Sequence, residues 1–303
     1  MKNAIKVICF VLVVIIAGIG SGYVYFTWDV GEYRTIEGSQ FGTVIITEYI
    51  GEETDVVIPN RLRGKKVVSI DDNAFKGTEI TSVKFNDNIV SIGVNSFQNC
   101  EKLAKVDMGK SLKSIGNNAF SNCPELTEVV FSPAVEKIGY VIFGNNEKLT
   151  TIDLNGNENL KFDDGVLYSA DMTTIYETLV SADLSDYDCP ETVVNLNGYA
   201  FYSQDELTSV TLNDGLKTIP EGTFIDCKNL TEITIPDSVV SIGTVILSGS
   251  GVKTIKIPAS VTKIDDGAFF NVEEQVTIVT TRGSVAAKFA EKNNMKLTIV
   301  ESL

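Results

Sequence analysis

The feature that most constrains this chain is a pair of residues that recurs every 22 or 23 positions. In each pair an aliphatic side chain is followed five positions later by Phe. The pairs are Ile70 with Phe75, Ile92 with Phe97, Ile115 with Phe120, Ile138 with Phe143, Leu196 with Phe201, Ile219 with Phe224, and Ile264 with Phe269. Ile242–Ile246 fills a further slot, and the 58-residue step from Phe143 to Phe201 fits one normal and one expanded repeat. A fixed period of this length is the signature of a stacked-repeat fold.

A second pattern, in which apolar and polar residues alternate, lies between these pairs. It predicts a short half-buried strand in each repeat, at residues 82–85, 105–108, 128–131, 151–154, 209–212, 232–235, 254–257 and 275–279. One 23-residue unit cannot bury its own apolar face, so stacked units must share a continuous core. The strands then form a parallel sheet with ~4.8 Å between coils, and the recurrent Phe forms a ladder in the core. We expect Gly93, Gly116, Gly139 and Gly243 to permit turns between the two patterns.

Residues 115–139, IGNNAFSNCPELTEVVFSPAVEKIG, resemble the BspA-type leucine-rich repeat. Residues 41–75 resemble the N-terminal cap of that family, 163–201 its expanded hairpin repeat, and 282–300 its closing helix and last strand. The resemblance implies a right-handed leucine-rich-repeat solenoid with a parallel β-sheet on the concave face and irregular or short helical turns on the convex side. It also implies a secreted or surface protein that binds a protein partner, such as a host or matrix protein. Residues 140–143 and 242–246 depart from the family pattern.

The N-terminal segment is strongly apolar. Residues 7–26 hold no charge, and twenty helical residues span ~30 Å, the thickness of a bilayer core. Lys2 and Lys6 precede the segment and acids follow it, which places the N-terminus in the cytoplasm and exports the rest. We predict a transmembrane signal anchor, with Trp28 among its aromatic residues at the outer interface. The alternative is a signal peptide cleaved near the small residues at 17–22. Both alternatives place the repeats outside the cell.

These observations divide the chain into four parts. Residues 1–6 form a cytoplasmic region, 7–28 the membrane segment, 29–35 a short linker, and 36–303 the leucine-rich-repeat domain. Within this domain we expect an N-terminal cap at 36–75, the expanded repeat at 163–201 and a C-terminal cap at 282–303. The pattern at 285–294 predicts a helix with Ser284 as its N-cap.

Composition argues against several functions. There is no His, which excludes Ser-His-Asp and Cys-His catalysis and every His-containing zinc site. The formal net charge of −15 disfavours nucleic acid. Cys100, Cys123 and Cys227 share one repeat position without any CxxC pair, so we interpret them as a turn feature of stacked coils, although Cys100 and Cys123 fall near disulfide range. Paired Asp residues lack the spacing of a calcium loop. We predict no catalytic residue, metal or cofactor.

Two groups of residues are candidates for ligand binding. The first is the outward face of the strands, a flat polar surface of mixed charge that includes Lys84, Lys105, Asp107, Asp153 and Thr211. The second is the expanded repeat and its flank, where Tyr168, Tyr176, Tyr187, Tyr199 and Tyr202 gather, because Tyr is enriched at interfaces. The alternatives are that the face binds nothing and that the Tyr side chains cover a hairpin at 166–179.

The sequence therefore predicts an exported, membrane-anchored leucine-rich-repeat protein that mediates protein–protein interaction or adhesion at the cell surface. We expect a monomer that is not an enzyme. Two alternatives stay open: a structural spacer without a specific ligand, and a carboxylate-based enzyme acting on glycans.

Overall fold

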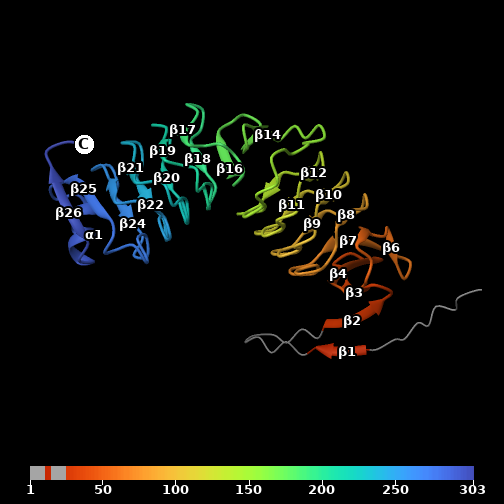
Figure 1. Ribbon diagram of the computed structural model, residues 1–303. Helices are drawn as coiled ribbons and strands as arrows, with labels where there is room; N and C mark the ends of the chain where they lie inside the picture. The colour runs from red at the N-terminus through yellow and green to blue at the C-terminus, as the bar shows by residue number, and fades with distance from the viewer. Residues whose placement is uncertain (1–10, 15–24) are drawn as a thin grey trace, which may run out of the picture. The chain divides into compact units, whose positions relative to one another are not determined.

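The computed structural model describes residues 11–14 and 25–303, with side chains from Trp28 onward (Figure 1). The chain forms two compact units. Unit 1 comprises the residues up to Phe143 together with Thr151–Asn157, and unit 2 comprises Gly144–Thr150 and Glu158–Leu303. Each unit is a stack of short-stranded coils, so the predicted parallel solenoid is confirmed.

The start of unit 1 is an antiparallel sheet that leads into the repeats. Strands β1 (Val11–Val14), β2 (Tyr25–Val30), β3 (Tyr33–Glu37) and β4 (Thr43–Tyr49) pair in that order, each antiparallel to the one before. β4 then pairs in parallel with β7 (Lys65–Ile70), and β6 (Arg61–Leu62) forms a tight hairpin with β7. The antiparallel strands therefore cover the first coil, which a solenoid requires at its ends.

The repeats build two parallel ladders in each unit. The three-residue ladder contains the predicted alternating segments: β5 (Asp55–Val57), β8 (Ser82–Lys84), β10 (Lys105–Asp107) and β12 (Glu128–Val130) in unit 1, and β17 (Asp186–Asp188), β19 (Ser209–Thr211), β21 (Glu232–Thr234) and β23 (Thr254–Lys256) in unit 2. In unit 2 this ladder consists of two separate sheets, one with β17 and β19 and one that begins with β21 and β23. At 151–154 the predicted strand is reduced to one bridge between Val130 and Asp153.

The two-residue ladder contains the aliphatic residue of each Ile–Phe pair, where the sequence pattern predicts no strand. Its strands are β9 (Ser91–Ile92), β11 (Ser114–Ile115) and β13 (Lys137–Ile138) after β7, and β18 (Asn195–Leu196), β20 (Thr218–Ile219), β22 (Ser241–Ile242) and β24 (Lys263–Ile264) in unit 2. Strands of two residues are too short to show alternation in sequence, which is why the pattern missed them.

The recurrent Phe side chains stack as predicted. In unit 1 the ring centroids of Phe75 and Phe97 lie 4.8 Å apart, those of Phe97 and Phe120 5.1 Å, and those of Phe120 and Phe143 5.9 Å. All four side chains are buried, and Ile246 in unit 2 fills the slot that lacks Phe with no exposed surface. The aromatic ladder is therefore the core of the stack.

The four repeated glycines have a different role from the expected one. None of Gly93, Gly116, Gly139 and Gly243 has a positive φ, so they are not the turn residues. A Cβ on Gly116 would lie 2.4 Å from the carbonyl carbon of Gly93 on the preceding coil. Glycine is thus needed because adjacent backbones approach closely at this position. The left-handed turns are made mainly by asparagines such as Asn95 and Asn118, both with φ 55°.

The expanded repeat and the C-terminus close unit 2. Strand β14 (Leu160–Asp163) pairs antiparallel with β15 (Val166–Ser169), which forms a hairpin with β16 (Thr174–Thr178). Helix α1 (Val285–Lys292) is capped by Ser284, whose side chain accepts from the Ala287 amide at 3.0 Å. Strands β25 (Thr277–Thr281) and β26 (Lys296–Val300) extend the three-residue ladder. Phe289 of α1 packs edge-on against Phe269, so the helix covers the last coil.

The predicted membrane segment, residues 7–28, falls mostly outside the described residues. Its described parts, Val11–Val14 and 25–28, lie in β1 and β2. No helix within the described ranges has the length and apolar character needed to cross a bilayer.

Candidate functional site

The outward face of the three-residue ladder in unit 1 is a set of regular polar rows. Parallel pairing places Ser82, Lys105 and Glu128 in one row and Lys84 and Asp107 in the next. Because the register is in phase between coils, each outward side chain lies directly beside its counterpart from the preceding coil. The five positions are thus held in a fixed array along the stack.

Ion pairs connect neighbouring coils across this face. The Nζ atom of Lys84 lies 2.7 Å from Oδ2 of Asp107, and that of Lys105 lies 2.9 Å from Oε1 of Glu128. The hydrogen bond from Lys84 to Asp107 raises the pKa of this lysine. Both lysine side chains remain about 60 % exposed, at 63 % and 60 %. The lysines are therefore oriented by their partners yet accessible to a ligand.

Two acidic residues among the predicted ligand-binding candidates also stabilise turns. Oδ1 of Asp107 accepts from the Gly109 amide at 2.9 Å, and Oδ1 of Asp153 accepts from the Asn155 amide at 2.8 Å. These are side-chain turns of the kind that Asp makes with the backbone two residues on. Asp107 thus contributes one oxygen to the turn and one to Lys84.

In unit 2 the same face carries short hydroxylated side chains. Thr211 is exposed and pairs in register with Asp188. In the adjacent row the Ser209 hydroxyl donates to Oδ1 of Asp186 at 2.7 Å. The Ser82 hydroxyl donates to Oδ1 of Asp55 at 2.8 Å in unit 1, so both units contain the same inter-coil contact.

The five candidate tyrosines do not form one surface. Tyr168 and Tyr187 are buried, with 4 % and 9 % exposure, and their hydroxyl oxygens lie 2.8 Å apart. Burial raises the pKa of both tyrosines, and Tyr187 also packs edge-on against Phe201 at 5.4 Å. These two residues belong to the core of the expanded repeat and are inaccessible to a partner.

The other three tyrosines are half-buried. Tyr199 donates to Oε1 of Glu221 at 2.9 Å, and its ring lies against Tyr202 with centroids 6.5 Å apart. A Cβ on Gly222 would lie 2.3 Å from the Tyr199 ring, which shows that this ring lies over the next coil. Tyr199 and Tyr202 therefore form an oriented aromatic pair. Tyr176 lies in β16.

The cysteines are structural. All four described cysteines are buried, and none of them forms a disulfide. The thiols of Cys100, Cys123 and Cys227 donate to the carbonyl oxygens of Phe75, Phe97 and Phe201 at 3.1, 3.3 and 3.0 Å. Burial raises the pKa of Cys227 to about 12 and that of Cys189 to about 11, so neither is a reactive thiolate. Within 11–14 and 25–303, no group of three or more Cys, Asp or Glu is placed to hold a metal ion.

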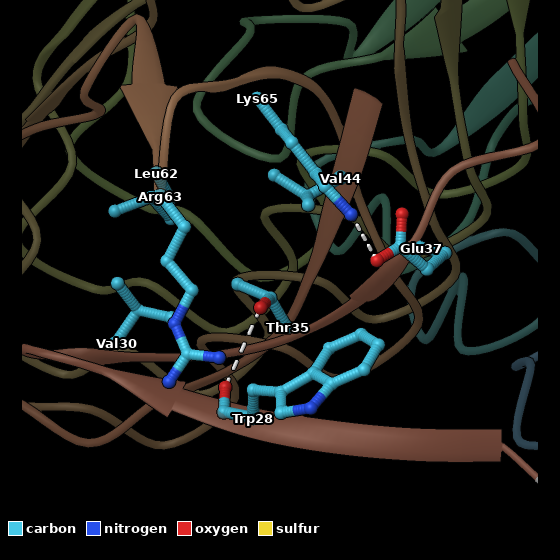
Figure 2. Close-up of a pocket in the computed structure, with 8 residues that line it drawn as sticks. All are labelled: Trp28, Val30, Thr35, Glu37, Val44, Leu62, Arg63 and Lys65. Carbon is cyan, nitrogen blue, oxygen red and sulfur yellow. Dashed lines mark hydrogen bonds and ion pairs between the residues drawn. The ribbon is translucent and has the colours of Figure 1, made fainter. Parts of the chain in front are cut away.

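Three surface hollows accompany the ladders. One of about 350 Å³ lies between Tyr49 and Ile80 and carries Glu52, Glu53 and Glu79. A second of about 320 Å³, in unit 2, contains the ion pair between Lys228 and Asp205 at 2.8 Å. The third, of about 230 Å³, lies at the start of unit 1 between Trp28 and the β6–β7 hairpin (Figure 2). The sequence reasoning overlooked this last region, although residues 56–70 contain four basic side chains and no acid.

Stacked two- and three-residue strands, a buried Phe ladder and outward polar rows define a leucine-rich-repeat solenoid. A family model described as the BspA-type leucine-rich repeat region matches residues 68–178 and 177–277, in six copies. The chain therefore belongs to the BspA-type leucine-rich-repeat family, as its sequence resemblance implied.

Solved structures of other proteins are similar to this chain. The pneumococcal vaccine antigen PcpA is 16 % identical over 91 % of this chain and 99 % of its own, with a TM-score of 0.54. The T. pallidum leucine-rich repeat protein TpLRR is 24 % identical over 72 % of this chain and 86 % of its own, with a TM-score of 0.44. A leucine-rich cell surface protein from Faecalibacterium prausnitzii is 21 % identical over 86 % and 96 %, with a TM-score of 0.42. No curated protein matches the chain.

Proposed function

We propose that this protein is an exported, membrane-anchored binding protein that recognises another protein at the cell surface. The binding surface in each unit is the outward face of its three-residue ladder, and the Tyr199–Tyr202 pair is a further contact in unit 2. The observation that carries the proposal is the fixed register of this face, which presents exposed Lys84, Lys105 and Thr211 on rigid strands.

A face of this kind suits a protein partner. Its side chains are held in place by the strands and by inter-coil ion pairs, so binding costs less side-chain entropy than it would on a mobile loop. Its charges alternate in sign, which favours a partner of complementary pattern and sets specificity. A net charge of −15 disfavours nucleic acid. Membership of a family of surface proteins supports the extracellular location.

The membrane anchor rests on the sequence. Residues 7–26 are uncharged and long enough to span a bilayer, with Lys2 and Lys6 on the cytoplasmic side. We propose that the segment is retained, so the repeats stay attached to the outer side of the membrane as a monomer. Light scattering of the detergent-solubilised chain tests the monomeric state.

A binding screen tests the proposed face. The purified chain is assayed against cell-surface and matrix proteins, and every interaction is repeated with Lys84→Glu combined with Lys105→Glu. These changes break two surface ion pairs, each worth about 0–1 kcal/mol, so the fold is retained. The matched control is Lys113→Glu with Lys137→Glu, an equal charge change at exposed positions beside the two-residue ladder. We expect a partner that the first variant fails to bind and the control binds normally. If both variants bind a partner equally weakly, that partner does not bind through Lys84 and Lys105.

A further inference from the structure

One edge of the N-terminal sheet is where β1 ends and β2 begins, because Val14 pairs with Tyr25. β4 and β7 are parallel and begin at this edge, because Thr43 pairs with Lys66. β3 is antiparallel to β4 and ends there, and β2 is antiparallel to β3 and begins there, at Tyr25. The edge where β1 ends and β2 begins therefore also carries the β3–β4 turn and the tip of the β6–β7 hairpin.

This edge is the most basic part of the chain. The hairpin places Arg61 opposite Lys66 and Leu62 opposite Lys65, with Arg63 and Gly64 at its tip. Lys65 pairs with Glu37, and Arg63 donates to the Asp29 carbonyl oxygen at 3.5 Å. Arg61 and Lys66 are exposed, and no ion pair links either of them to another residue in the described ranges. We call Phe41, Arg61, Arg63, Lys65 and Lys66 the basic edge.

Aromatic side chains accompany these charges. Phe41, in the β3–β4 turn, is fully exposed, and the amide of Lys66 donates to the carbonyl oxygen of the adjacent Gly42 at 2.9 Å. The hollow at this edge has Trp28 as one wall, with Lys65 5.9 Å from the centre of the Trp28 ring. Figure 2 shows the Arg63 side chain extending toward β2 beside the same hollow. Exposed aromatic and basic groups therefore occur together.

Acidic side chains gather at the opposite edge. Glu32 lies in the β2–β3 turn and contacts the end of β4 through a hydrogen bond from Ile50 to its carbonyl oxygen, at 2.8 Å. Glu52, Glu53 and Glu79 line the hollow next to Tyr49. β4 has seven residues, which separates the two edges by ~20 Å. The N-terminal sheet is thus polarised, with positive charge at the edge where β2 begins and negative charge at the opposite edge.

We infer that the basic edge docks on the anionic phospholipid surface of the membrane that holds the hydrophobic segment. Phe41 inserts among the headgroups, and Arg61, Arg63, Lys65 and Lys66 approach lipid phosphates. This inference deepens the proposed function and rests on its membrane anchor. Its consequence is that unit 1 has a defined orientation, with its first coil at the bilayer.

A phospholipid surface fits these features better than a soluble polyanion does. Basic residues near an anionic bilayer are attracted by its surface potential, and a soluble polyanion would satisfy the charges equally well. A soluble polyanion would leave Phe41 in water, however, whereas aromatic side chains favour the membrane interface. The hydrophobic segment also delivers this edge to the bilayer without a separate encounter, which raises its effective concentration there.

Fluorescence quenching in vesicles tests this docking. Because Trp28 is the only Trp of the chain, Trp28→Phe provides a background without Trp fluorescence. The full chain, carrying Phe41→Trp in this background, is reconstituted into phosphatidylcholine vesicles with or without phosphatidylglycerol, and quenching by brominated phosphatidylcholine is measured. Phe270→Trp, at an exposed position of unit 2, is the matched control. We expect quenching of the residue 41 reporter in phosphatidylglycerol vesicles and none of the residue 270 reporter.

Charge reversal gives a second readout. Arg61→Glu with Lys66→Glu should reduce quenching at residue 41 to the level at residue 270. Lys288→Glu with Lys296→Glu, an equal charge change on exposed residues of unit 2, should leave it intact. Unchanged quenching in the first variant overturns the docking. Binding of dextran sulfate through the same lysine and arginine residues, with residue 41 unquenched in vesicles, also overturns it and assigns the edge to a soluble polyanion.

Vesicle flotation distinguishes this inference from the anchor. Flotation with neutral and anionic vesicles, together with quenching at residue 41 in the anionic ones, supports both. Flotation with both and no quenching retains the anchor and overturns the docking. Flotation only with anionic vesicles, abolished by Arg61→Glu with Lys66→Glu, retains the docking and overturns the anchor. A chain that floats with neither overturns both.

Discussion

At the scale of single residues, the coils depend on a few left-handed backbone positions. Asn95, Asn118, Val141 and Val245 all occupy the same repeat position, with φ between 54° and 55°. Asn tolerates this conformation, whereas a β-branched residue there is strained. Val141 and Val245 lie in the two segments that depart from the family pattern. The departure therefore introduces local backbone strain at these two residues.

Val245→Asn should relieve this strain. Val245 is half-buried, so little apolar burial is lost, and we expect the free energy of unfolding to rise by about 1 kcal/mol. Urea denaturation measures the change. Val194→Asn, at an exposed valine without a positive φ, is the control and should give no increase. If Val245→Asn is as destabilising as Val194→Asn or more so, the strain is not significant.

The buried tyrosine pair should make stability fall at high pH. Burial raises the pKa of Tyr168 and Tyr187 above 10 in the folded state. Between pH 10 and the folded pKa, the unfolded chain has released these protons and the folded chain has not. Stability is therefore fully present below pH 10 and is lost as pH rises, by at most about 1.4 kcal/mol per pH unit for each tyrosine.

Tyr168→Phe with Tyr187→Phe tests this dependence. Removing both partners of a buried hydrogen bond costs little, so the free energy of unfolding should barely change at pH 7. Between pH 10 and 11 the variant should lose less stability than the parent chain. If urea denaturation shows the same loss of unfolding free energy between pH 10 and 11 in both chains, the pair does not ionise on unfolding in this range.

At the scale of the structural elements, coil stacking depends on close backbone approach. A Cβ at residue 116 would meet the backbone of Gly93 at 2.4 Å, so Gly116→Ala must separate two coils. We expect a loss of about 1–3 kcal/mol, as for overpacking in a core. Gly267→Ala is the matched control, since its Cβ would meet nothing nearer than 3.8 Å and its φ is not positive. Equal denaturation midpoints for both variants would refute this role.

The elements differ in how far sequence could predict them. Three-residue strands such as β8 and β10 were predictable because their inward and outward residues alternate, and the Phe ladder was predictable from its period. The two-residue strands carry no alternation, so the pattern gave no signal for β9 or β11. The role of Gly116 could not be inferred from the sequence either. Close approach between coils and a left-handed turn both favour glycine, and only the structure shows that residue 116 contacts the coil 23 positions earlier.

The candidate site shows the same limits. Lys84, Lys105 and Thr211 are exposed on the ladder because strand alternation fixes which side chains point outward. The tyrosines lie in irregular segments, where sequence proximity does not determine burial. Tyr168 and Tyr187 consequently proved to be core residues, while Tyr199 and Tyr202 form a pair over the next coil. The basic edge comes from a hairpin that acquires its position only through pairing with β4.

At the scale of the whole molecule, we expect the mature chain to retain its hydrophobic segment. Mass spectrometry of the membrane fraction should give the mass of the full 303-residue chain, 32.9 kDa. High salt should not release the chain, because an apolar segment that spans the bilayer holds it independently of charge. A mature protein that lacks residues 1–22 and appears in the medium would instead indicate a cleaved signal peptide.

If the protein acts at the cell surface, the ladder face must be displayed outside the cell and be available to a partner. Because the described native cysteines are buried, Thr211→Cys introduces an accessible thiol on this face. We would measure its reaction rate with a membrane-impermeant maleimide on intact cells, with and without a partner found in the binding screen. We expect the thiol to be labelled on intact cells and the labelling to slow when the partner is saturating. Labelling only after lysis, or an unchanged rate with the partner bound, would contradict this expectation.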